Sequence, residues 1–508
     1  MFSSINSFGV SGIGGYGVEV EVYISNGLPG FDIVGLPDAA VKEARERVRA
    51  AIKNNGFRFP VSRLTVNLAP ADKKKAGTVY ALPILVGILA ASGDIDAPGS
   101  DTAFIGELSL LGELRPVQGA LPMALAAARE GVRELFVPAE NADEAAFAED
   151  ITVYPVKNVR ELLRHLRGEE KIEPAQPPRP GEDVRPLPDF ADVKGQENVK
   201  RAFEIAAAGG HNILIVGPPG AGKSMMAKRL PGILPEMSRD EMIQCTEIHS
   251  VAGLTGREHP IIAQRPFRAP HHTVSAIGLA GGGSFPRPGE ISLAHNGVLF
   301  LDELPEFQRQ VLEVMRQPLE DGYVNVSRLE GSYRYPAKFQ LTAALNPCKC
   351  GYYPDRKKCT CSQGQIKNYL GRISKPLLDR IDIFTETIIL KYGEISNSDK
   401  GENSYNVRKR IEKVHHIQKE RYKNDGILFN SELSAGMIKR YCVMDNEAKE
   451  YLENIFENME FSARAYHKVL KTARTIADMD ESGEIKRKHI SEAVCYRTAD
   501  KKYWGVTM

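Results

Sequence analysis

The feature that most constrains this chain is a glycine-rich loop that joins an apolar segment to a segment with helical spacing. Residues 211–216 read HNILIV, and residues 217–224 read GPPGAGKS. Together they form the complete P-loop pattern in the strand–loop–helix context that it requires. The backbone N–H groups of such a loop and the first turn of the helix can bind a phosphate. The segment therefore predicts a nucleotide-binding α/β domain.

The charged and hydroxyl residues at the end of this loop have separate predicted roles. Lys223 would reach the β- and γ-phosphates of the nucleotide, and the Ser224 hydroxyl would hold Mg²⁺. A glycine turn without a ligand is the alternative, which the preceding strand and the Gly-Lys-Ser ending disfavour. The residues predicted to bind the nucleotide are Gly217, Pro218, Pro219, Gly220, Ala221, Gly222, Lys223 and Ser224.

Two more apolar segments end in polar residues. The segment VLFL precedes Asp302 and Glu303, and the segment LTAAL precedes Asn346. Continuous apolar strands are typical of a parallel sheet that is covered on both faces. We expect Asp302 in the metal shell, Glu303 as the base that activates the attacking water, and Asn346 near the γ-phosphate. The Asn-Pro sequence at 346–347 is also compatible with an ordinary turn.

Two arginines are candidates for sensing phosphate. Arg380 lies in SKPLLDRIDI, and Arg464 lies in FSARAYHKVL. A fixed guanidinium can stabilise the negative charge that develops during phosphoryl transfer. The sequence context of both residues favours this role over that of ordinary solvated arginines.

Composition excludes several classes of protein. The chain has 508 residues, of which 42% are hydrophobic and 26% charged, and its formal net charge is +1. These values argue against disorder throughout, a collagen-like chain and a globally basic nucleic-acid coat. No apolar run reaches the roughly 18 residues of a membrane span. The N-terminus lacks the basic and long apolar regions of a secretory leader. We therefore expect a cytoplasmic protein without a membrane partner.

The pattern along the chain predicts three folded regions. Strand and helix patterns alternate in residues 1–166, for example in a helix at 38–54 and a buried helix at 80–92. Residues 167–190 are rich in proline and charge, which predicts a linker, with a surface loop as the alternative. An α/β domain is expected at residues 191–395, and a helical C-terminal region at residues 396–508.

Four of the seven cysteines form two closely spaced pairs, Cys348 with Cys350 and Cys359 with Cys361. Four thiolates suit a closed tetrahedral zinc site, and free thiols or a redox switch are the alternatives. The remaining three stand alone and are expected in the core. These lone cysteines are Cys245, Cys442 and Cys495.

Two segments combine basic and aromatic side chains. The first reads RPFRAPHH at 265–272, and the second reads VNVSRLEGSYRY at 324–335, with the spacing of a hairpin. Such loops suit phosphate backbones, and Tyr333 could stack on a base. A structural insert is the alternative for both, and adjacent histidines without spaced partners are a weak metal signal. The candidate DNA-contacting residues are Arg265, Arg268, His271, His272, Arg328 and Arg334.

Taken together, these motifs resemble an AAA+ ATPase of the magnesium-chelatase-like branch. The phrases FRAPHHTVS and GEISLAHNGVLFLDELPEF and the paired C-x-C motifs resemble the YifB/ComM family in particular, over essentially the whole chain. The resemblance implies a homo-hexameric, ATP-driven helicase that uses Mg²⁺ and acts on single-stranded or branched DNA in natural transformation. It also implies that Arg380 is an arginine finger acting across a subunit boundary and that Arg464 is the sensor-2 arginine of a C-terminal lid.

By the same resemblance, two insertions of this branch, at 250–295 and 323–336, face a central pore. The N-terminal domain resembles the Lon-protease fold, which is like the second domain of ribosomal protein S5. Lon proteases use a serine nucleophile and a lysine base, but the matching segments here read GTVYA from Gly77 and QGALPMA from Gln118. Because both catalytic groups are missing, we expect a scaffold and not a protease.

Two rival functions remain at this stage. The chain could be a chelatase-type ATPase subunit that drives metal insertion through partner proteins, or a non-motor scaffold. The intact Lys223, Asp302 and Glu303 disfavour the scaffold, and the full-length N-terminal domain favours a DNA motor over a chelatase subunit.

Overall fold

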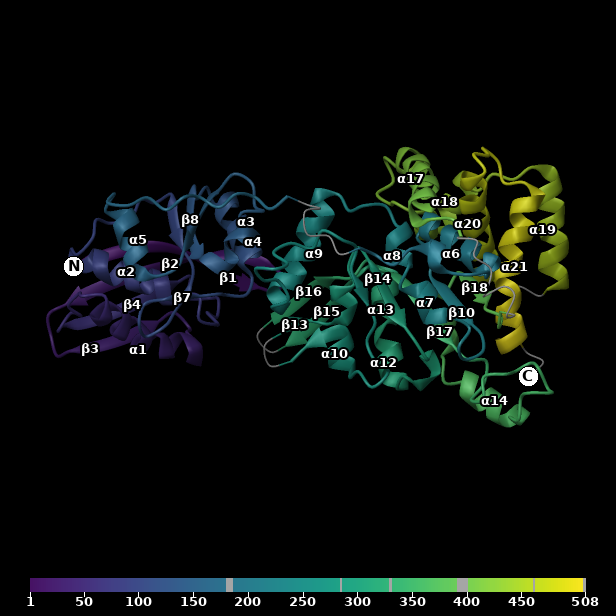
Figure 1. The fold of residues 1–508 in the computed structure, drawn as a ribbon, viewed down its shortest axis with the longest axis horizontal. Helices are drawn as coiled ribbons and strands as arrows, with labels where there is room; N and C mark the ends of the chain where they lie inside the picture. Colours follow the sequence, from purple (N-terminus) through teal and green to yellow (C-terminus); the bar gives the residue numbers. More distant parts are fainter. Residues whose placement is uncertain (180–185, 284–285, 329–330, 391–400, 460–461, 506–508) are drawn as a thin grey trace. The chain divides into compact units, whose positions relative to one another are not determined.

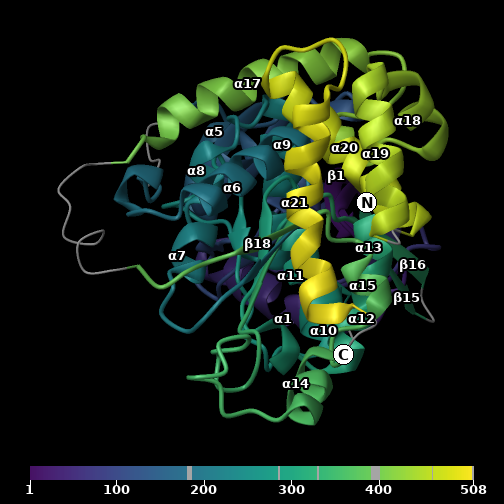
Figure 2. The ribbon, with the colours of Figure 1, turned by 90° about the vertical axis from the view of Figure 1, so that its right-hand side faces the viewer.

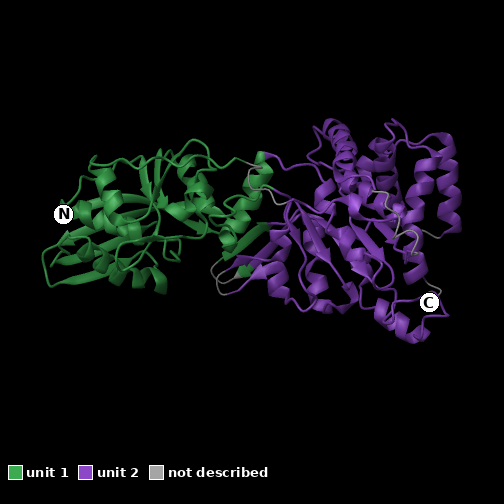
Figure 3. Ribbon diagram, viewed as in Figure 1, with its two compact units in different colours: residues 1–184, 239–263, 327–335 green, residues 185–238, 264–326, 336–508 purple. Residues whose placement is uncertain are grey.

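The computed structural model describes residues 1–179, 186–283, 286–328, 331–390, 401–459 and 462–505. The chain divides into two compact units that are not continuous in sequence (Figure 3). Unit 1 contains residues 1–184, 239–263 and 327–335, and unit 2 contains residues 185–238, 264–326 and 336–508. Part of the predicted linker, 180–185, and part of the predicted boundary before the C-terminal region, 391–400, lie outside the described residues.

Unit 1 is built on one mixed seven-stranded sheet with the order β3-β4-β2-β1-β5-β8-β9 (Figure 1). Strand β2 pairs antiparallel with β1 and with β4, and the other neighbours pair parallel. The sheet strands are β1 (Phe2–Ser11), β2 (Gly14–Ser25), β3 (Gly30–Val34), β4 (Arg63–Ala69), β5 (Thr102–Phe104), β8 (Glu134–Pro138) and β9 (Thr152–Val156).

The helices of unit 1 bury their apolar sides against this sheet. Helix α2 is apolar on every side, packs on β1 and β2, and is covered in turn by α1. Helix α3 also packs on β1 and β2, and it contacts α9. These helices are α1 (Ala39–Asn54), α2 (Ala81–Ser92), α3 (Ala120–Arg129), α4 (Ala142–Ala145), α5 (Val159–Leu166) and α9 (Arg239–Ala252), and two short strands, β6 (Glu107–Leu108) and β7 (Leu114–Arg115), form a separate pair.

Helix α9 joins unit 1 through a buried carboxylate. Glu144 on α4 accepts hydrogen bonds from the Ser250 hydroxyl, the Thr255 hydroxyl at 2.8 Å and the backbone N–H of Leu121 at 2.8 Å. Burial raises the pKa of the Glu144 carboxyl, and these hydrogen bonds oppose the shift. The first part of the predicted insertion at 250–295 is therefore fastened to the N-terminal fold.

Unit 2 contains a five-stranded parallel sheet with the order β11-β14-β17-β10-β18. Its three central strands are completely buried, as their continuous apolar sequences predict. The strands are β10 (Ile213–Val216), β11 (Phe267–Arg268), β14 (Val298–Leu301), β17 (Gln340–Leu345) and β18 (Ile383–Glu386), and the flanking helices are α6 (Glu197–Gly209), α7 (Lys223–Ala227), α8 (Leu230–Ile233), α11 (Glu290–Leu293), α12 (Arg309–Val314), α13 (Arg316–Asp321), α14 (Gln363–Leu370) and α15 (Lys375–Leu378).

Two small strand pairs and a short helix complete the middle of the chain. The predicted hairpin is confirmed as β15 (Tyr323–Arg328) and β16 (Gly331–Pro336), which form a two-stranded sheet. The other pair is β12 (Gly281–Gly282) with β13 (Arg287–Pro288), next to α10 (Ala276–Ala280).

The C-terminal region is helical, as predicted. Its helices are α17 (Ser404–Arg421), α18 (Ala435–Tyr441), α19 (Asn446–Asn458), α20 (Ala463–Met479) and α21 (Arg487–Trp504). Helix α21 runs along α20, and its last turn reaches α14, where Trp504 Nε1 donates to the Leu370 carbonyl at 3.2 Å (Figure 2). No helix in the described ranges is long and apolar enough to cross a membrane.

A buried ionic cluster connects these helices to the parallel sheet. Asp382, just before β18, lies 3.1 Å from Lys468 Nζ on α20 and 3.5 Å from His211 Nδ1. Burial opposes ionisation of the Asp382 carboxyl, but the Lys468 ammonium and the contact with His211 hold its pKa well below the usual range, and burial lowers the pKa of Lys468. Charges buried in this way are costly unless they are paired, so the cluster fixes α20 to the edge of the sheet.

Three details of the sequence-based prediction are wrong. Cys495, predicted in the core, is exposed because its position on α21 faces solvent, whereas Cys245 and Cys442 are buried. The apolar pattern of residues 1–166 also predicts one strand at 104–108, whereas the structure has two separate strands, β5 ending at Phe104 and β6 beginning at Glu107. Residues 267–268, predicted as part of a loop, form β11, the edge strand of the parallel sheet.

Candidate nucleotide-binding site

The parallel sheet brings the predicted nucleotide-binding residues to one edge. Strand β17 lies between β10 and β14, and its register pairs Leu345 with Val216 and Ala343 with Leu301. Gly217, Asp302 and Asn346 each follow the carboxyl end of one of these strands, so they meet at the same edge. A cavity of about 380 Å³ opens there. It is lined by Pro219, Gly220, Ala221, Gly222, Lys223, Ser224, Met225, Asp302, Glu303, Leu345 and Asn346.

Lys223 is held at the centre of this cavity. Its Nζ donates to the carbonyl oxygens of Gly217 and Pro218, each at 2.9 Å, and to Asn346 Oδ1 at 3.0 Å. Burial lowers the pKa of the Lys223 ammonium, and the nearby Asp302 and Glu303 oppose that shift. The ammonium of Lys223 thus lies at the P-loop, where phosphate oxygens would bind, with Asn346 next to it.

The Ser224 hydroxyl and the Asp302 carboxylate lie together in the same cavity. Ser224 Oγ donates to Asp302 Oδ2 at 2.5 Å. Hard oxygen ligands of this kind are what Mg²⁺ prefers, together with phosphate oxygens and water. The residues present therefore fit a bound Mg²⁺, with Ser224 and Asp302 as its protein side.

Glu303 has an unusual backbone. Its φ is 51°, in the left-handed region that residues with a side chain rarely adopt, and its N–H donates to Asp302 Oδ1 at 2.9 Å. Its carboxylate lines the cavity and lies 3.5 Å from His272 Nδ1. Sequence reasoning missed this contact and treated His272 only as a candidate DNA-contacting residue.

The two phosphate-sensing candidates do not line this cavity in the described part of the chain. Arg380 is bound by the carboxylate of Glu320 on α13, and its Nε donates to the Arg316 carbonyl at 3.1 Å. Arg464 is 72% exposed, and its Nη1 lies 2.7 Å from the carboxylate of Asp379, the residue next to Arg380. Both arginines belong to unit 2, and neither lines the cavity at the chain's own P-loop among the described residues.

The four clustered cysteines fit a metal site. Their Sγ atoms all lie within 4.8 Å of one another, and Cys348 Sγ is 3.3 Å from Cys350 Sγ and 3.7 Å from Cys359 Sγ. Tetrahedral zinc–thiolate bonds of about 2.3 Å require sulfur–sulfur separations of roughly 3.8 Å. Cys361 completes the group. We call residues 348–361 the cysteine knuckle.

The cysteine knuckle lies against the P-loop. It begins two residues after Asn346, and Gly351 in it has a φ of 84°. A Cβ atom on Gly351 would meet Cδ of Pro219 at 2.4 Å, so only glycine allows this close approach. The knuckle is therefore positioned to brace the loop that would bind the nucleotide.

Two of the candidate DNA-contacting arginines brace unit 2. Arg268 on β11 makes a bidentate ion pair with Glu290, at 2.6 and 2.7 Å. Arg265 donates to the carbonyl oxygens of Pro235, at 2.6 Å, and Asn296, at 2.8 Å. These contacts favour the structural alternative for both residues, because their guanidinium groups are already engaged.

The candidate DNA-contacting residues of the hairpin lie at or near the surface in its described part. Arg334 on β16 is exposed, and Tyr333 packs beside Gly12 in the turn between β1 and β2. Within unit 1, residues 11–14 and 331–334 line a polar hollow of about 320 Å³. Arg328 ends β15, and its side chain lies outside the described part of the structure. His271 is exposed, with its ring centroid 4.1 Å from that of His272.

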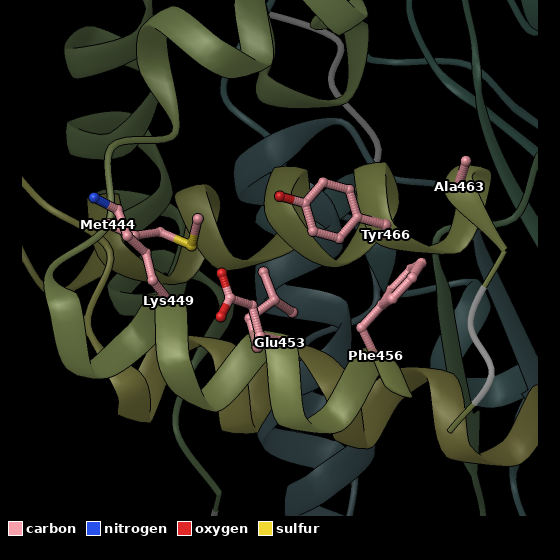
Figure 4. Close-up of a pocket in the computed structure, with 7 residues that line it drawn as sticks. Met444, Lys449, Glu453, Phe456, Ala463 and Tyr466 are labelled. Atoms are coloured by element: carbon pink, nitrogen blue, oxygen red, sulfur yellow. The ribbon is translucent and has the colours of Figure 1, made fainter. Parts of the chain in front are cut away.

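Another hollow, of about 290 Å³, lies between α19 and α20 (Figure 4). Phe456 and Tyr466 face it with the side chain of Met444, and among the described residues its charged lining groups are Lys449 and Glu453. The described residues that line it include no glycine loop like the one in the cavity at Lys223, so the cavity at Lys223 is the candidate nucleotide site.

The chain is similar to known proteins over nearly its whole length. "Competence protein ComM" of Haemophilus influenzae is 45% identical over 94% of this chain and 94% of its own length. "Uncharacterized protein YifB" of Escherichia coli is 42% identical over 98% of this chain and 97% of its own length. The chain belongs to the ComM/YifB family. The "Magnesium-chelatase 38 kDa subunit" of Rhodobacter capsulatus is 26% identical but covers only 34% of the chain.

Family models place this ComM/YifB member in the magnesium-chelatase-like AAA+ group. The model "Magnesium chelatase, subunit ChlI" matches residues 189–395, which contain the parallel sheet and the P-loop. "Subunit ChlI of Mg-chelatase" matches residues 20–141, and "Magnesium chelatase, subunit ChlI C-terminal" matches residues 401–497. The resemblance found in the sequence is thus confirmed at the level of the family and of the AAA+ fold.

Proposed function

We propose that this chain is a Mg·ATP-hydrolysing motor that assembles as a homo-hexamer and moves DNA, as a helicase that promotes branch migration during natural transformation. The observation that carries the proposal is the convergence of Lys223, Ser224, Asp302, Glu303 and Asn346 on one cavity at the carboxyl edge of a parallel sheet. The long match to a relative named as a competence protein supports the pathway.

In the proposed reaction, the chain's own groups divide the work. The P-loop N–H groups and Lys223 bind the β- and γ-phosphates, and Ser224 and Asp302 hold Mg²⁺, which neutralises phosphate charge when bound. Glu303 accepts a proton from the attacking water, and Asn346 orients that water or the γ-phosphate. Lys223 and Asn346 are already in contact at 3.0 Å, so both can face the same phosphate group.

We assign Arg380 and Arg464 to the neighbouring protomer's site. Both lie away from the chain's own cavity, and Arg464 pairs with Asp379, the residue that precedes Arg380 in the sequence. The resemblance of the SKPLLDR segment to arginine-finger segments supports this role for Arg380, whose guanidinium would have to exchange Glu320 for phosphate oxygens of the neighbouring site to act there. A homo-hexamer would bring such a surface against each P-loop.

For DNA, we propose the hairpin as the principal contact, through Arg334, Tyr333 and Arg328, with His271 as an additional group. The exposed Arg334 and the polar hollow beside it support this choice. Phosphate contacts carry no sequence information, so binding should be sequence-tolerant and sensitive to salt.

The cysteine knuckle is proposed to bind one zinc ion, and the N-terminal fold to act as a scaffold without protease activity. In that fold, the completely buried Lys75 donates its Nζ to the carbonyl of Pro70, so this lysine is engaged in structure. The position of the missing Lon nucleophile, at 77–81, has no serine; its hydroxyls belong to Thr78, which donates to Glu107, and to Tyr80, which is buried beside Tyr16.

The rival function is a chelatase-type subunit, which the three magnesium-chelatase family models favour. It is weakened because the chelatase subunit of Rhodobacter capsulatus covers only 34% of this chain. Steady-state phosphate release with and without branched DNA tests the proposal. A DNA motor predicts that DNA raises ATP turnover, whereas a chelatase subunit predicts the same turnover with and without it.

A further inference from the structure

His272 and Glu303 meet because of the register of two neighbouring strands. Strands β11 and β14 are parallel and adjacent, and Arg268 pairs with Leu299. His272 and Glu303 lie four residues beyond these paired positions, so both follow their strands at the same edge of the sheet. The fold thereby brings His272 Nδ1 within 3.5 Å of Glu303 Oε2.

The Glu303 carboxylate needs a neighbouring group such as the His272 ring to hold it in one orientation. Its side chain is 55% exposed, and its backbone is in the left-handed region, which is strained for a residue with a side chain. Such a conformation persists only where the surroundings impose it, and it occurs often at functional sites. The N–H contact to Asp302 fixes the backbone of Glu303 but not its carboxylate.

The His272 ring is itself restrained. Its centroid lies 4.1 Å from that of His271, at an interplanar angle of 35°, and 6.4 Å from that of Phe307, at 75°. Phe307 is only 3% exposed, so it provides a rigid wall beside the ring. A restrained ring can hold a flexible carboxylate because the energetic cost of ordering the ring has already been met by packing.

We propose that His272 is a positioning residue for Glu303, holding its carboxylate toward the cavity where the attacking water would bind. The inference rests on the proposed ATPase function and assigns His272 to the hydrolysis step instead of to DNA contact. The imidazole transfers no proton to the water in this account, since it acts through Glu303.

The test compares three purified full-length variants, His272→Ala, His272→Asn and His416→Ala. The asparagine amide places an N–H group near the position of Nδ1, so it can keep the contact. His416 is an exposed histidine on α17, also in a His-His pair, and serves as the matched control. Steady-state phosphate release gives kcat and KM for ATP, and binding of a fluorescent ATP analogue gives the affinity.

We expect His272→Ala to lower kcat about tenfold with KM and nucleotide affinity nearly unchanged, because misdirecting a catalytic group costs turnover and not binding. His272→Asn should recover most of kcat, and His416→Ala should match wild type. An unchanged or higher kcat in His272→Ala would overturn the inference, as would equal losses in the alanine and asparagine variants. If wild-type protein itself hydrolysed no ATP, the proposed function would fail, which is a distinct result.

Discussion

Glu303 is the residue on which the proposed chemistry most depends. It lies one position beyond Asp302, lines the nucleotide cavity and has a carboxylate directed at His272. Replacing it with glutamine keeps its size and hydrogen-bonding capacity but removes its ability to accept a proton. Glu303→Gln should therefore bind ATP with near wild-type affinity and hydrolyse it about 10²–10⁴-fold more slowly.

Phosphate release and binding of a fluorescent ATP analogue separate the two effects. The neighbouring Lys223→Ala variant is the contrasting control, since loss of the phosphate-binding ammonium should weaken binding itself. Turnover near the wild-type rate in Glu303→Gln would remove Glu303 from its assigned role as base.

The site residues differ in how far their positions and contacts can be predicted from the sequence. The positions of Lys223, Asp302 and Asn346 follow from motifs, because the P-loop pattern places Lys223 at the start of a helix and the other two residues directly follow apolar strands. The contact between Glu303 and His272 does not follow from a motif. It depends on the register of β11, a strand of two residues with no recognisable sequence pattern. The engagement of Arg268 by Glu290 could not be read from spacing for the same reason.

At the level of elements, strands and helices with continuous or periodic apolar patterns were predictable. Strands β10, β14 and β17 are all-buried apolar runs, and α2 is buried on almost every side. Strand β1 was missed because two of its buried positions carry serines, Ser3 and Ser7, which obscure the alternation. Helix α9 was missed because its apolar side chains do not gather on one face.

The cysteine knuckle gives a prediction at this scale. Protein purified without chelator should contain about one zinc per chain by elemental analysis. Removing the metal should also weaken ATP binding, because Gly351 packs directly against Pro219 of the P-loop. Replacing Cys359 and Cys361 by serine should reproduce both effects. Metal-free protein with a full set of thiols and unchanged ATP affinity would argue against this account.

The hairpin of β15 and β16 gives a second prediction at the level of elements, which concerns DNA binding. Arg334→Ala should weaken DNA binding and make its dependence on salt shallower by about one unit of slope for each phosphate contact that is lost. Arg334→Lys retains the charge and should keep most of the slope. Titration of labelled DNA at several salt concentrations measures both. The same affinity and slope in Arg334→Ala would exclude this arginine from the DNA path.

At the scale of the whole molecule, the sequences of the two units are interleaved. Residues 239–263 and 327–335, which lie between parts of unit 2 in the sequence, belong to unit 1. The buried Glu144 anchors the first of these through Ser250 and Thr255. The linker predicted at 167–190 could be inferred from composition, but this interleaving could not, since it depends on tertiary contacts of polar residues distant in sequence.

Assembly provides the next prediction. Arg380→Ala and Lys223→Ala proteins should each be nearly inactive, since an arginine finger contributes about 10³–10⁵ in rate. When the two are mixed, some interfaces combine an intact P-loop with an intact finger, and ATP turnover should partly recover. A mixture of Arg464→Ala and Lys223→Ala proteins should show the same partial recovery of ATP turnover. No recovery at any ratio, with hexamers intact by sedimentation, would show that these arginines do not act across a protomer boundary.

The most direct test of the central claim is movement of a DNA branch point. Purified protein is added to a labelled four-way junction with homologous arms, with or without Mg·ATP, and the products are separated on a gel. We predict that the wild-type protein converts the junction to exchanged duplexes only when ATP is hydrolysed, and that Glu303→Gln does not. Active ATP turnover without any ATP-dependent movement of the junction would contradict a DNA motor.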